Sequence, residues 1–336
     1  MEWVRGDVVG HGSFGTVSLA IPRKRSHEVP PFMAVKSCGS SHSGLLLNEK
    51  STLEELNDCP QIIKCFGGGF SLENGERLCN LLLEFASGGS LADKLGNCRN
   101  HRLLESEVRQ YSRSVLDGLR YIHGNGFVHC DLKLQNVLLC EKDVAKIADF
   151  GLAKRAGEKT GPELRGTPLY MSPEMVVSGE QEAPADVWAL GCLVAEMATG
   201  APAWPCQPDA DLCGLLMRIG VGEDIPEIPG NLSAEGKDFL GKCFVKDPRK
   251  RWTAEMLLSH PFVVDSCEFS YSDSPRGPLD LPESEFGQSS CSITSLPLPE
   301  YFSPLSSGIS PANRVQQLVT NQRPDWSVTD SWLTVR

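Results

Sequence analysis

The chain has 336 residues, of which 40% are hydrophobic and 22% charged, as in an ordinary soluble globular protein with one large two-lobed domain or two smaller ones. The formal net charge of −11 argues against a nucleic-acid partner, because a protein that binds nucleic acid needs a basic face. The longest apolar run, residues 187–198, is too short to span a membrane, so we expect no membrane partner. Its thirteen cysteines form no CxxC pair and no signal region opens the chain, so we expect free thiols in a reducing compartment, cytoplasmic and/or nuclear.

The first predicted elements are two strands joined by a glycine-rich turn, within residues 8–20. Glycines let the backbone fold closely over phosphates, where a Cβ would intrude. A lone GxGxxG is weak and also occurs in dinucleotide-binding folds, but here a strand-like segment with Lys36 follows, as expected of a lysine that pairs the α- and β-phosphates of ATP. The residues expected at the nucleotide are Val9, Gly10, His11, Gly12, Ser13, Phe14, Gly15, Thr16, Val17, Ala34 and Lys36.

A helix is predicted over residues 45–56, and it carries several carboxylates. We choose Glu49 as the partner of Lys36, while Glu54 and Glu55 are nearby competitors that we assign to a solvated face. The ion pair would hold the lysine extended towards the nucleotide, and its separation would switch the site off.

Residues 78–85 form a mostly apolar stretch typical of a buried strand, followed by a Gly- and Ser-rich segment suited to a hinge. By position, the backbone of Glu84 and Ala86 would meet the adenine edge, with Leu83 at the back of the pocket and Leu138 as its floor. These side chains would be plain core residues in any fold, so this assignment depends on the surrounding pattern.

The densest chemistry lies at residues 129–136. Phosphoryl transfer needs a carboxylate that orients the attacking hydroxyl, a cation on the migrating phosphoryl group and an amide oxygen on a metal ion. Asp131, Lys133 and Asn136 supply that set, and Asp149, in an Asp-Phe-Gly sequence, adds a second metal ligand. We therefore predict a kinase with ATP and Mg²⁺ as cofactors. Its catalytic residues are expected to be Asp131, Lys133, Lys36 and Glu49.

Two long helices are predicted in this half of the chain. Residues 105–125 alternate apolar and polar positions at helical spacing and stop at a Gly-Asn-Gly sequence. A second, buried helix begins at residues 186–188 and continues through residues 189–199. The pattern of a globular domain closes at residues 260–262.

Residues 149–174, which we term the activation segment, are polar, Gly-rich and too irregular for a regular element. Long loops of this kind are often functional. Thr160 lies near the middle, among cations such as Lys154 and Arg155 that could bind a phosphate placed on it.

The end of the activation segment is expected to be anchored at two points. We interpret Thr167 as an architectural hydroxyl beside Asp131 and Lys133. Seven residues later, Glu174 is expected to form a buried ion pair with Arg251.

Residues 3–262 resemble the eukaryotic protein-kinase domain, because the Gly-rich loop, the strand lysine, the catalytic loop, Asp-Phe-Gly, Ser-Pro-Glu, Asp-x-Trp and a closing arginine come in order. The resemblance implies an α+β, bilobal fold. Residues 3–84 would form a small β-rich lobe with one main helix, and residues 88–262 a larger, mainly helical lobe. Lys133 and the Gly-Thr sequence at residues 166–167 resemble the Ser/Thr class rather than the tyrosine class.

Residues 166–174 are similar to MAP kinase kinase kinases, and the compact N-terminal lobe resembles the plant MEKK-like subgroup. This resemblance implies Ser/Thr phosphorylation of MAP kinase kinases, in plants commonly within stress or hormone signalling. The alternatives are a Ser/Thr kinase outside that cascade and a nucleotide-binding pseudokinase scaffold. The pseudokinase is disfavoured because every residue that turnover requires is intact, namely Lys36, Glu49, Asp131, Asn136 and Asp149.

Two residues depart from the family pattern. Ser172 replaces the usual alanine, a change we expect to be tolerated, and Cys130 replaces the arginine that normally binds a phosphate on the activation segment. Because a neutral thiol stands where the family has a cation, the catalytic loop has no comparable need for that phosphate. We therefore expect appreciable activity without it. In the alternative, Cys130 is a neutral substitution and phosphorylation of Thr160 still orders the segment.

The last stretch, residues 266–336, is rich in Ser and Pro and cannot bury enough apolar surface to offset its ordering entropy, so we predict a mostly disordered tail. Trp326 and Trp332 are unusual for a linker. A short docking segment for regulators and chance occurrence explain them equally well.

Overall fold

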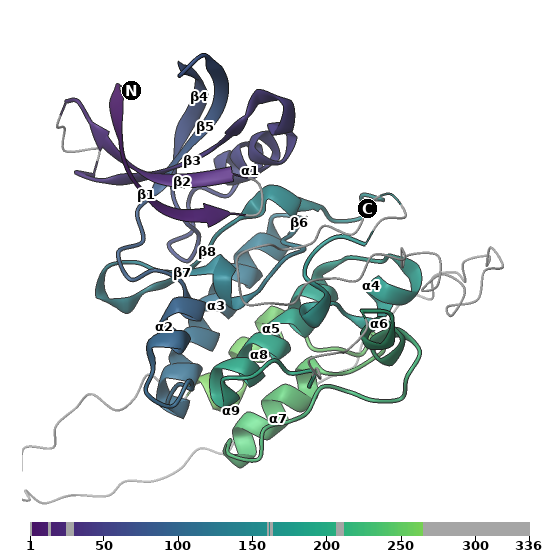
Figure 1. Cartoon of the computed structure of the whole chain (residues 1–336). Coiled ribbons are helices and arrows are strands. Elements are labelled where there is room, and N and C mark those ends of the chain that lie inside the picture. The colour runs from purple at the N-terminus through teal and green to yellow at the C-terminus, as the bar shows by residue number, and fades with distance from the viewer. Residues whose placement is uncertain are drawn as a thin grey trace, which may run out of the picture.

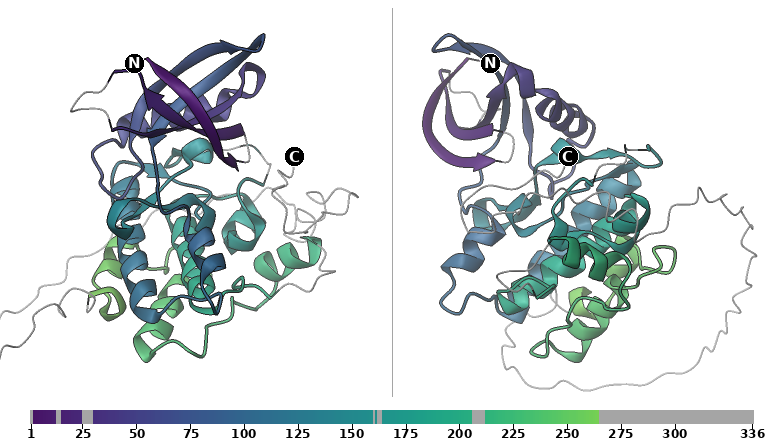
Figure 2. Two further views of the ribbon diagram at one scale, coloured as in Figure 1. Left: turned by 60° about the vertical axis from the view of Figure 1, so that its left-hand side comes forward. Right: turned by 45° about the vertical axis from the view of Figure 1, so that its right-hand side comes forward.

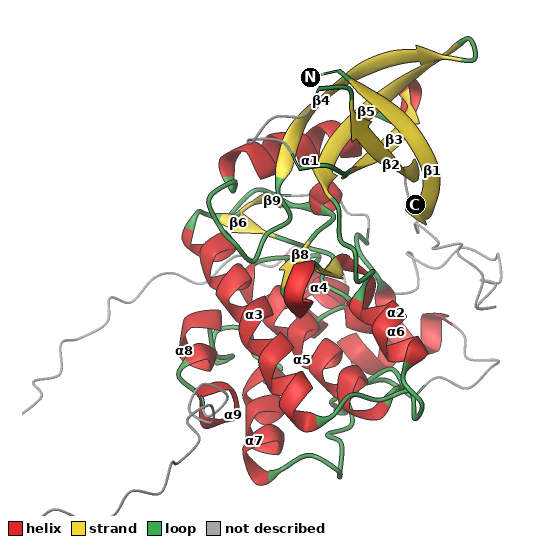
Figure 3. Cartoon of the chain, turned by 90° about the vertical axis from the view of Figure 1, so that its left-hand side faces the viewer, coloured by secondary structure: helices red, strands yellow, loops and turns green. Residues whose placement is uncertain are grey.

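The structure, a computed structural model, describes residues 2–12, 15–24, 30–159, 161, 164–205 and 212–264. In this part of the chain a small lobe rich in strands sits on a larger helical lobe (Figures 1 and 3). The predicted α+β bilobal fold is confirmed. Ser13, Phe14 and Thr160 of the predicted site lie outside the described residues, and so does the predicted tail.

The small lobe is built on one antiparallel sheet with the strand order β1-β2-β3-β5-β4. Its strands are β1 (Trp3–Gly12), β2 (Gly15–Pro22), β3 (Met33–Gly39), β4 (Cys65–Glu73) and β5 (Glu76–Glu84). Side chains alternate across a strand, so Met33 and Val35 of β3 face a small outer cluster while Ala34 and Cys38 join the main core. The same alternation points Lys36 inward.

Helix α1 (Gly44–Glu55) packs against β4 and β5 beside this sheet (Figure 2). Its buried residues Leu46, Glu49 and Leu53 are spaced by three and four positions, so they form one stripe along the helix. The helix predicted over residues 45–56 is confirmed to within one residue at each end.

Two helices pack against each other inside the large lobe, α3 (Glu105–Gly124) and α5 (Ala183–Thr199). The apolar stripe predicted for α3 is buried. Around them lie α2 (Leu91–Asn97), α4 (Pro173–Ser178), α6 (Leu212–Gly220), α7 (Ala234–Cys243), α8 (Ala254–Leu258) and α9 (Pro261–Val264). None of the described helices has the length and apolar character to cross a membrane.

Helix α5 begins earlier than predicted. The sequence analysis started it at residue 186, whereas the structure starts it at Ala183. Pro184 lies in the first turn, where its fixed φ suits a helix and its missing N–H costs no hydrogen bond. The prediction started the helix at Asp186 and so missed its first three residues.

The catalytic loop, residues 129–136, lies between two small two-stranded antiparallel sheets. Strand β6 (Phe127–Val128) precedes it and pairs with β9 (Lys154–Arg155), and β7 (Val137–Leu139) follows it and pairs with β8 (Ala145–Ile147). The prediction that residues 149–174 contain no regular element is therefore wrong. Strand β9 exists because a partner distant in sequence pairs with it, and a local pattern does not report such pairing.

The core position of α3 can be tested with Leu119→Ala. Leu119 is fully buried, so the truncation should lower the free energy of unfolding by about 3 kcal/mol through lost burial and the cavity left behind. Arg120→Ala, at an exposed neighbouring position, should change it by no more than about 0.5 kcal/mol. Urea denaturation followed by tryptophan fluorescence measures both, and similar small changes would contradict the assigned packing of α3.

Candidate active site

Lys36 lies between two carboxylates at the junction of the lobes. Its ammonium nitrogen is 2.7 Å from Oε2 of Glu49 on α1 and 2.8 Å from Oδ1 of Asp149, which follows β8. The side chains of Lys36 and Glu49 are 9% and 1% exposed, so little water screens the pair. The predicted ion pair is confirmed, and the competing Glu54 instead pairs with Lys50 along the helix.

Lys36 and Asp149 stabilise each other's charges, whereas burial raises the pKa of Glu49. Burial favours the neutral form of Lys36, but the carboxylates of Glu49 and Asp149 outweigh it and raise the pKa of the ammonium. Burial also acts to raise the pKa of Asp149, yet the charge and hydrogen bond of Lys36 leave that pKa below its ordinary value. At neutral pH Lys36 is therefore a cation and Asp149 an anion.

Asp149 is held in place by the residues that follow it. It adopts a left-handed backbone conformation with φ of 63°, and Phe150 after it is fully buried, with its ring 4.9 Å from the ring of His129 in an edge-on contact. Asn48 of α1 donates hydrogen bonds from Nδ2 to carbonyl oxygens of the same segment, the shortest of them 2.9 Å long. The start of the activation segment is thereby fastened to α1.

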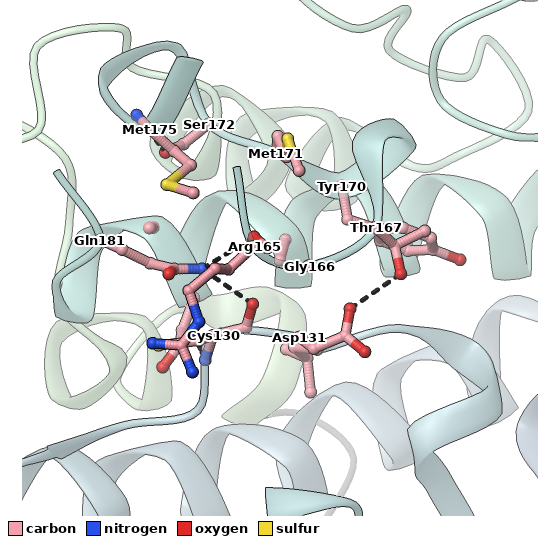
Figure 4. Close-up of a pocket in the computed structure, with 14 residues that line it drawn as sticks. Cys130, Asp131, Arg165, Gly166, Thr167, Tyr170, Met171, Ser172, Met175 and Gln181 are labelled. Carbon is pink, nitrogen blue, oxygen red and sulfur yellow. Dashed lines mark hydrogen bonds between the residues drawn. The ribbon is translucent and has the colours of Figure 1, made fainter. Parts of the chain in front are cut away.

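The carboxylate of Asp131 is fixed by three neighbours, one of which is Asn136, whose amide nitrogen donates to Oδ2 at 3.2 Å. Oδ1 of Asp131 accepts a hydrogen bond from the hydroxyl of Thr167 at 2.8 Å (Figure 4), and its Oδ2 lies 2.9 Å from Nζ of Lys133. Lys133 also donates to the Thr167 hydroxyl at 3.1 Å. Gly166 permits this approach, because its φ is 101° and a Cβ there would lie 2.7 Å from the carbonyl oxygen of Cys130. The predicted position of Thr167 is confirmed.

Asn136 and Asp149 are brought together by the pairing of β7 with β8. The backbone N–H of Ala148 donates to the carbonyl of Asn136 at 2.8 Å, one residue before Asp149. The amide nitrogen of Asn136 donates to the backbone carbonyl of Asp131 at 2.7 Å, while its amide oxygen accepts no hydrogen bond from the described residues. An amide oxygen and a carboxylate are oxygen ligands of the kind that Mg²⁺ takes, so these residues fit the ion.

Asp186, at the start of α5, organises the catalytic loop. Its carboxylate accepts hydrogen bonds from the backbone N–H groups of His129 at 2.9 Å and Cys130 at 3.0 Å, and it contacts Nε2 of His123 at 2.9 Å. Burial acts to raise the pKa of Asp186, but these partners leave it below the ordinary value. They also hold Cys130 at a φ of 71°, which few residues other than glycine adopt.

The strands on either side of the glycine-rich turn pair with each other, as predicted. Their register pairs residues 10–12 with residues 15–17. A Cβ at Gly15 would lie 2.1 Å from the carbonyl oxygen of Ser37, so β2 can approach β3 at this point only with glycine. The side chain of Val9 is half exposed rather than packed in the core.

The residues predicted to surround the adenine gather at the margin of the main core. Those that belong to the core or pack against it are Val17, Ala34, Leu83, Ala86 and Leu138. The backbone N–H of Ala86 donates to no group among the described residues, which leaves a donor for the edge of a base. The side chain of Glu84 is turned to Lys146, 2.7 Å away, so only its backbone is available there.

The end of the activation segment is anchored as predicted. Arg251 forms two bonds to the carboxylate of Glu174, of 2.7 and 3.0 Å, and the two side chains are 0% and 8% exposed. Arg251 also donates to the carbonyl of Pro184 in α5, which joins the segment to that helix. Ser172 accepts a hydrogen bond from the backbone N–H of Met175, so this departure from the family pattern caps α4.

A family model of the protein kinase domain matches residues 3–263. The chain belongs to the protein kinase family. It is 48% identical to Mitogen-activated protein kinase kinase kinase 20 of Arabidopsis thaliana over the whole of both chains. It is also 41% identical to Mitogen-activated protein kinase kinase kinases 17 and 18 of that plant, with 79% of this chain and 70% and 78% of the relatives covered. It is a protein serine/threonine kinase that resembles plant MAP kinase kinase kinases.

Two residues that position the site of this kinase were not predicted, Asn48 and Asp186. For Asp186 a signal exists, because it stands in the first turn of a mostly apolar helix, within the Asp-x-Trp sequence, and a buried charge needs partners. Asn48 gives no signal, since its partners are backbone carbonyls more than 100 residues away along the chain.

The role of Lys36 can be tested with Lys36→Met. Phosphoryl transfer should fall at least about a hundredfold, because the cation that holds the phosphates is gone. The fold should survive, since Glu49 can take up a proton when its counter-charge is removed. Initial rates together with circular dichroism measure the two effects. Lys237→Met, at an exposed position, is the matched control, and a folded Lys36→Met with full activity would contradict the assignment.

Proposed function

We propose that this kinase transfers the γ-phosphoryl group of ATP to serine or threonine hydroxyls of MAP kinase kinases. The observation that carries the chemistry is the pair of clusters at the lobe junction, one around Lys36 and one around Asp131. The substrate class comes from the names of the relatives, each a mitogen-activated protein kinase kinase kinase.

The Lys36 cluster is assigned to the nucleotide. Glu49 keeps the ammonium of Lys36 charged and holds it at the junction of the lobes, where it would bind a phosphate. Asp149 and Asn136 would hold Mg²⁺. Bound Mg·ATP supplies the phosphoryl group and neutralises part of its charge.

The Asp131 cluster is assigned to the protein substrate. A carboxylate oxygen has two lone pairs, so Asp131 can accept the proton of a serine or threonine hydroxyl while Thr167 and Lys133 fix its orientation. The ammonium of Lys133 also provides positive charge for the oxygens of the migrating phosphoryl group. The side chains therefore divide orientation, proton acceptance and charge stabilisation among them.

We place this activity in stress or hormone signalling, in the cytoplasm, the nucleus or both, with regulators that bind the tail. The support is the resemblance to plant MAP kinase kinase kinases, together with the acidic composition and the scattered cysteines.

The substrate proposal is tested with the purified full-length chain and a panel of kinase-inactive MAP kinase kinases. We expect phosphate on activation-loop serine or threonine residues of at least one member, detected by mass spectrometry. Phosphorylation of unrelated proteins but of no panel member would place the kinase outside the cascade. ATP binding without any transfer would instead favour a pseudokinase scaffold.

The role of Asp131 is tested with Asp131→Asn. We expect kcat to fall by about a hundredfold to ten-thousandfold, because the proton acceptor is lost. The KM for ATP should stay nearly constant, since Asp131 contacts neither Lys36 nor Glu49. Steady-state kinetics separate the two parameters. Loss of ATP binding in this variant would count against a role at the substrate hydroxyl.

A further inference from the structure

Glu182, directly before α5, reaches the activation segment. Its carboxylate accepts a hydrogen bond from Nζ of Lys154 at 2.7 Å, and each of its oxygens accepts one from the backbone N–H of Gly157 at 3.1 Å. The Lys154 side chain is 4% exposed, so Glu182 is the counter-charge of a buried ammonium.

The neighbouring Gln181 extends this connection to the catalytic loop. Its amide nitrogen donates to the carbonyl of Cys130 at 2.9 Å and to that of Arg165 at 3.4 Å (Figure 4). Gln181 is buried, and it lines a small cavity with those two residues. Gln181 and Glu182, which we term the 181–182 clamp, thus join β9, the end of the activation segment and the catalytic loop.

The contacts of Glu182 do not serve the helix that follows. Polar side chains directly before a helix commonly cap its free backbone N–H groups. Glu182 makes no such bond to α5, and its carboxylate is turned to Lys154 and Gly157 instead. Its interactions therefore hold the activation segment rather than α5.

Two cations expected to bind a phosphate on the activation segment are already paired. Lys154 is held by Glu182, and Arg155 forms an ion pair with Glu55 of α1. Cys130, in place of the usual arginine, is a thiol whose pKa burial raises well above the ordinary value, so it carries no charge. These groups are balanced without any modification of the chain.

We propose that Glu182 is a positioning residue that takes the place of a phosphate on the activation segment. Such a phosphate orders its segment by a negative charge and by oxygens that bind cations and N–H groups. Glu182 provides both, to Lys154 and Gly157, with a charge that is always present. The proposal rests on the proposed kinase activity and makes that activity independent of segment phosphorylation.

The clamp acts on catalysis through the contact between Thr167 and Asp131. Arg165, which Gln181 holds, is two residues before Thr167, so a loosened segment would draw the hydroxyl away from the carboxylate. The Lys36 cluster makes no contact with Glu182. Loss of the clamp should therefore lower kcat and leave the KM for ATP unchanged.

The experiment compares the full-length wild type, Glu182→Gln and Glu180→Gln, each measured before and after phosphatase treatment. Glu180 is exposed and forms no hydrogen bond or ion pair with the described residues, so its variant removes the same charge two positions away. Treated wild type and Glu180→Gln should keep their rates. Glu182→Gln should lose about tenfold in kcat, the effect of one charge-assisted hydrogen bond.

Lys154→Met provides the second variant, which decides the matter if Glu182→Gln fails to fold. It should show a similar loss of kcat, and the double variant should lose less than the product of the two single losses, because both substitutions break the contact between Lys154 and Glu182. Glu182→Asp keeps the charge and should recover part of the rate.

Four outcomes would overturn the proposal. Wild type without activity, treated or untreated, would refute the proposed function and the clamp with it. Wild type that is active only before phosphatase treatment would refute the clamp alone, as would full activity of folded Glu182→Gln. A parallel loss of Tm, of ATP affinity and of kcat in that variant would show a general structural role instead.

Discussion

The ammonium of Lys36 is the point on which the arrangement of the two lobes depends. Strand β3 contributes the lysine, α1 contributes Glu49, and the loop after β8 contributes Asp149. The ammonium nitrogen of Lys36 lies 2.7 Å from the carboxylate of Glu49 and 2.8 Å from that of Asp149. Loss of one member of a buried ion pair leaves a charge that either costs about 3–5 kcal/mol or is neutralised by a proton. A strand, a helix and a loop from two lobes therefore share one relative position, and in that position the groups proposed to bind phosphate and metal converge.

The large lobe uses buried charges in the same way. Asp186 accepts hydrogen bonds from two backbone N–H groups of the catalytic loop, and Arg251 forms an ion pair with Glu174 where the activation segment ends. Apolar side chains of α3 and α5 tolerate some repacking, whereas a buried carboxylate or guanidinium requires its partners in one geometry. The helices thus form the scaffold, and the few charges inside it fix the loops that carry Asp131 and Thr167.

Much of this site could be predicted, because short motifs set the residues at fixed spacings. The pairing of Lys36 with Glu49 and the contact of Thr167 with Asp131 followed from such motifs, and both are present. The start of α5 was missed, although a proline in the first turn is compatible with a helix start. The existence of β9 could not be predicted, since it depends on a partner strand distant in sequence. The contacts of Asn48, Gln181 and Glu182 are invisible for a related reason: hydrogen bonds to a distant backbone leave no periodic trace.

The balance of charge around Cys130 decides what kind of control this site can have. A segment that waits for a phosphate keeps cations unpaired until the modification arrives. Here Lys154 is paired with Glu182 and Arg155 with Glu55, and the residue before Asp131 is a neutral thiol, so these three positions are balanced without a phosphate. Helix α1 connects two parts of the site. Its adjacent residues Asn48 and Glu49 hold the start of the activation segment and Lys36, so a displacement of this one helix would release both at once.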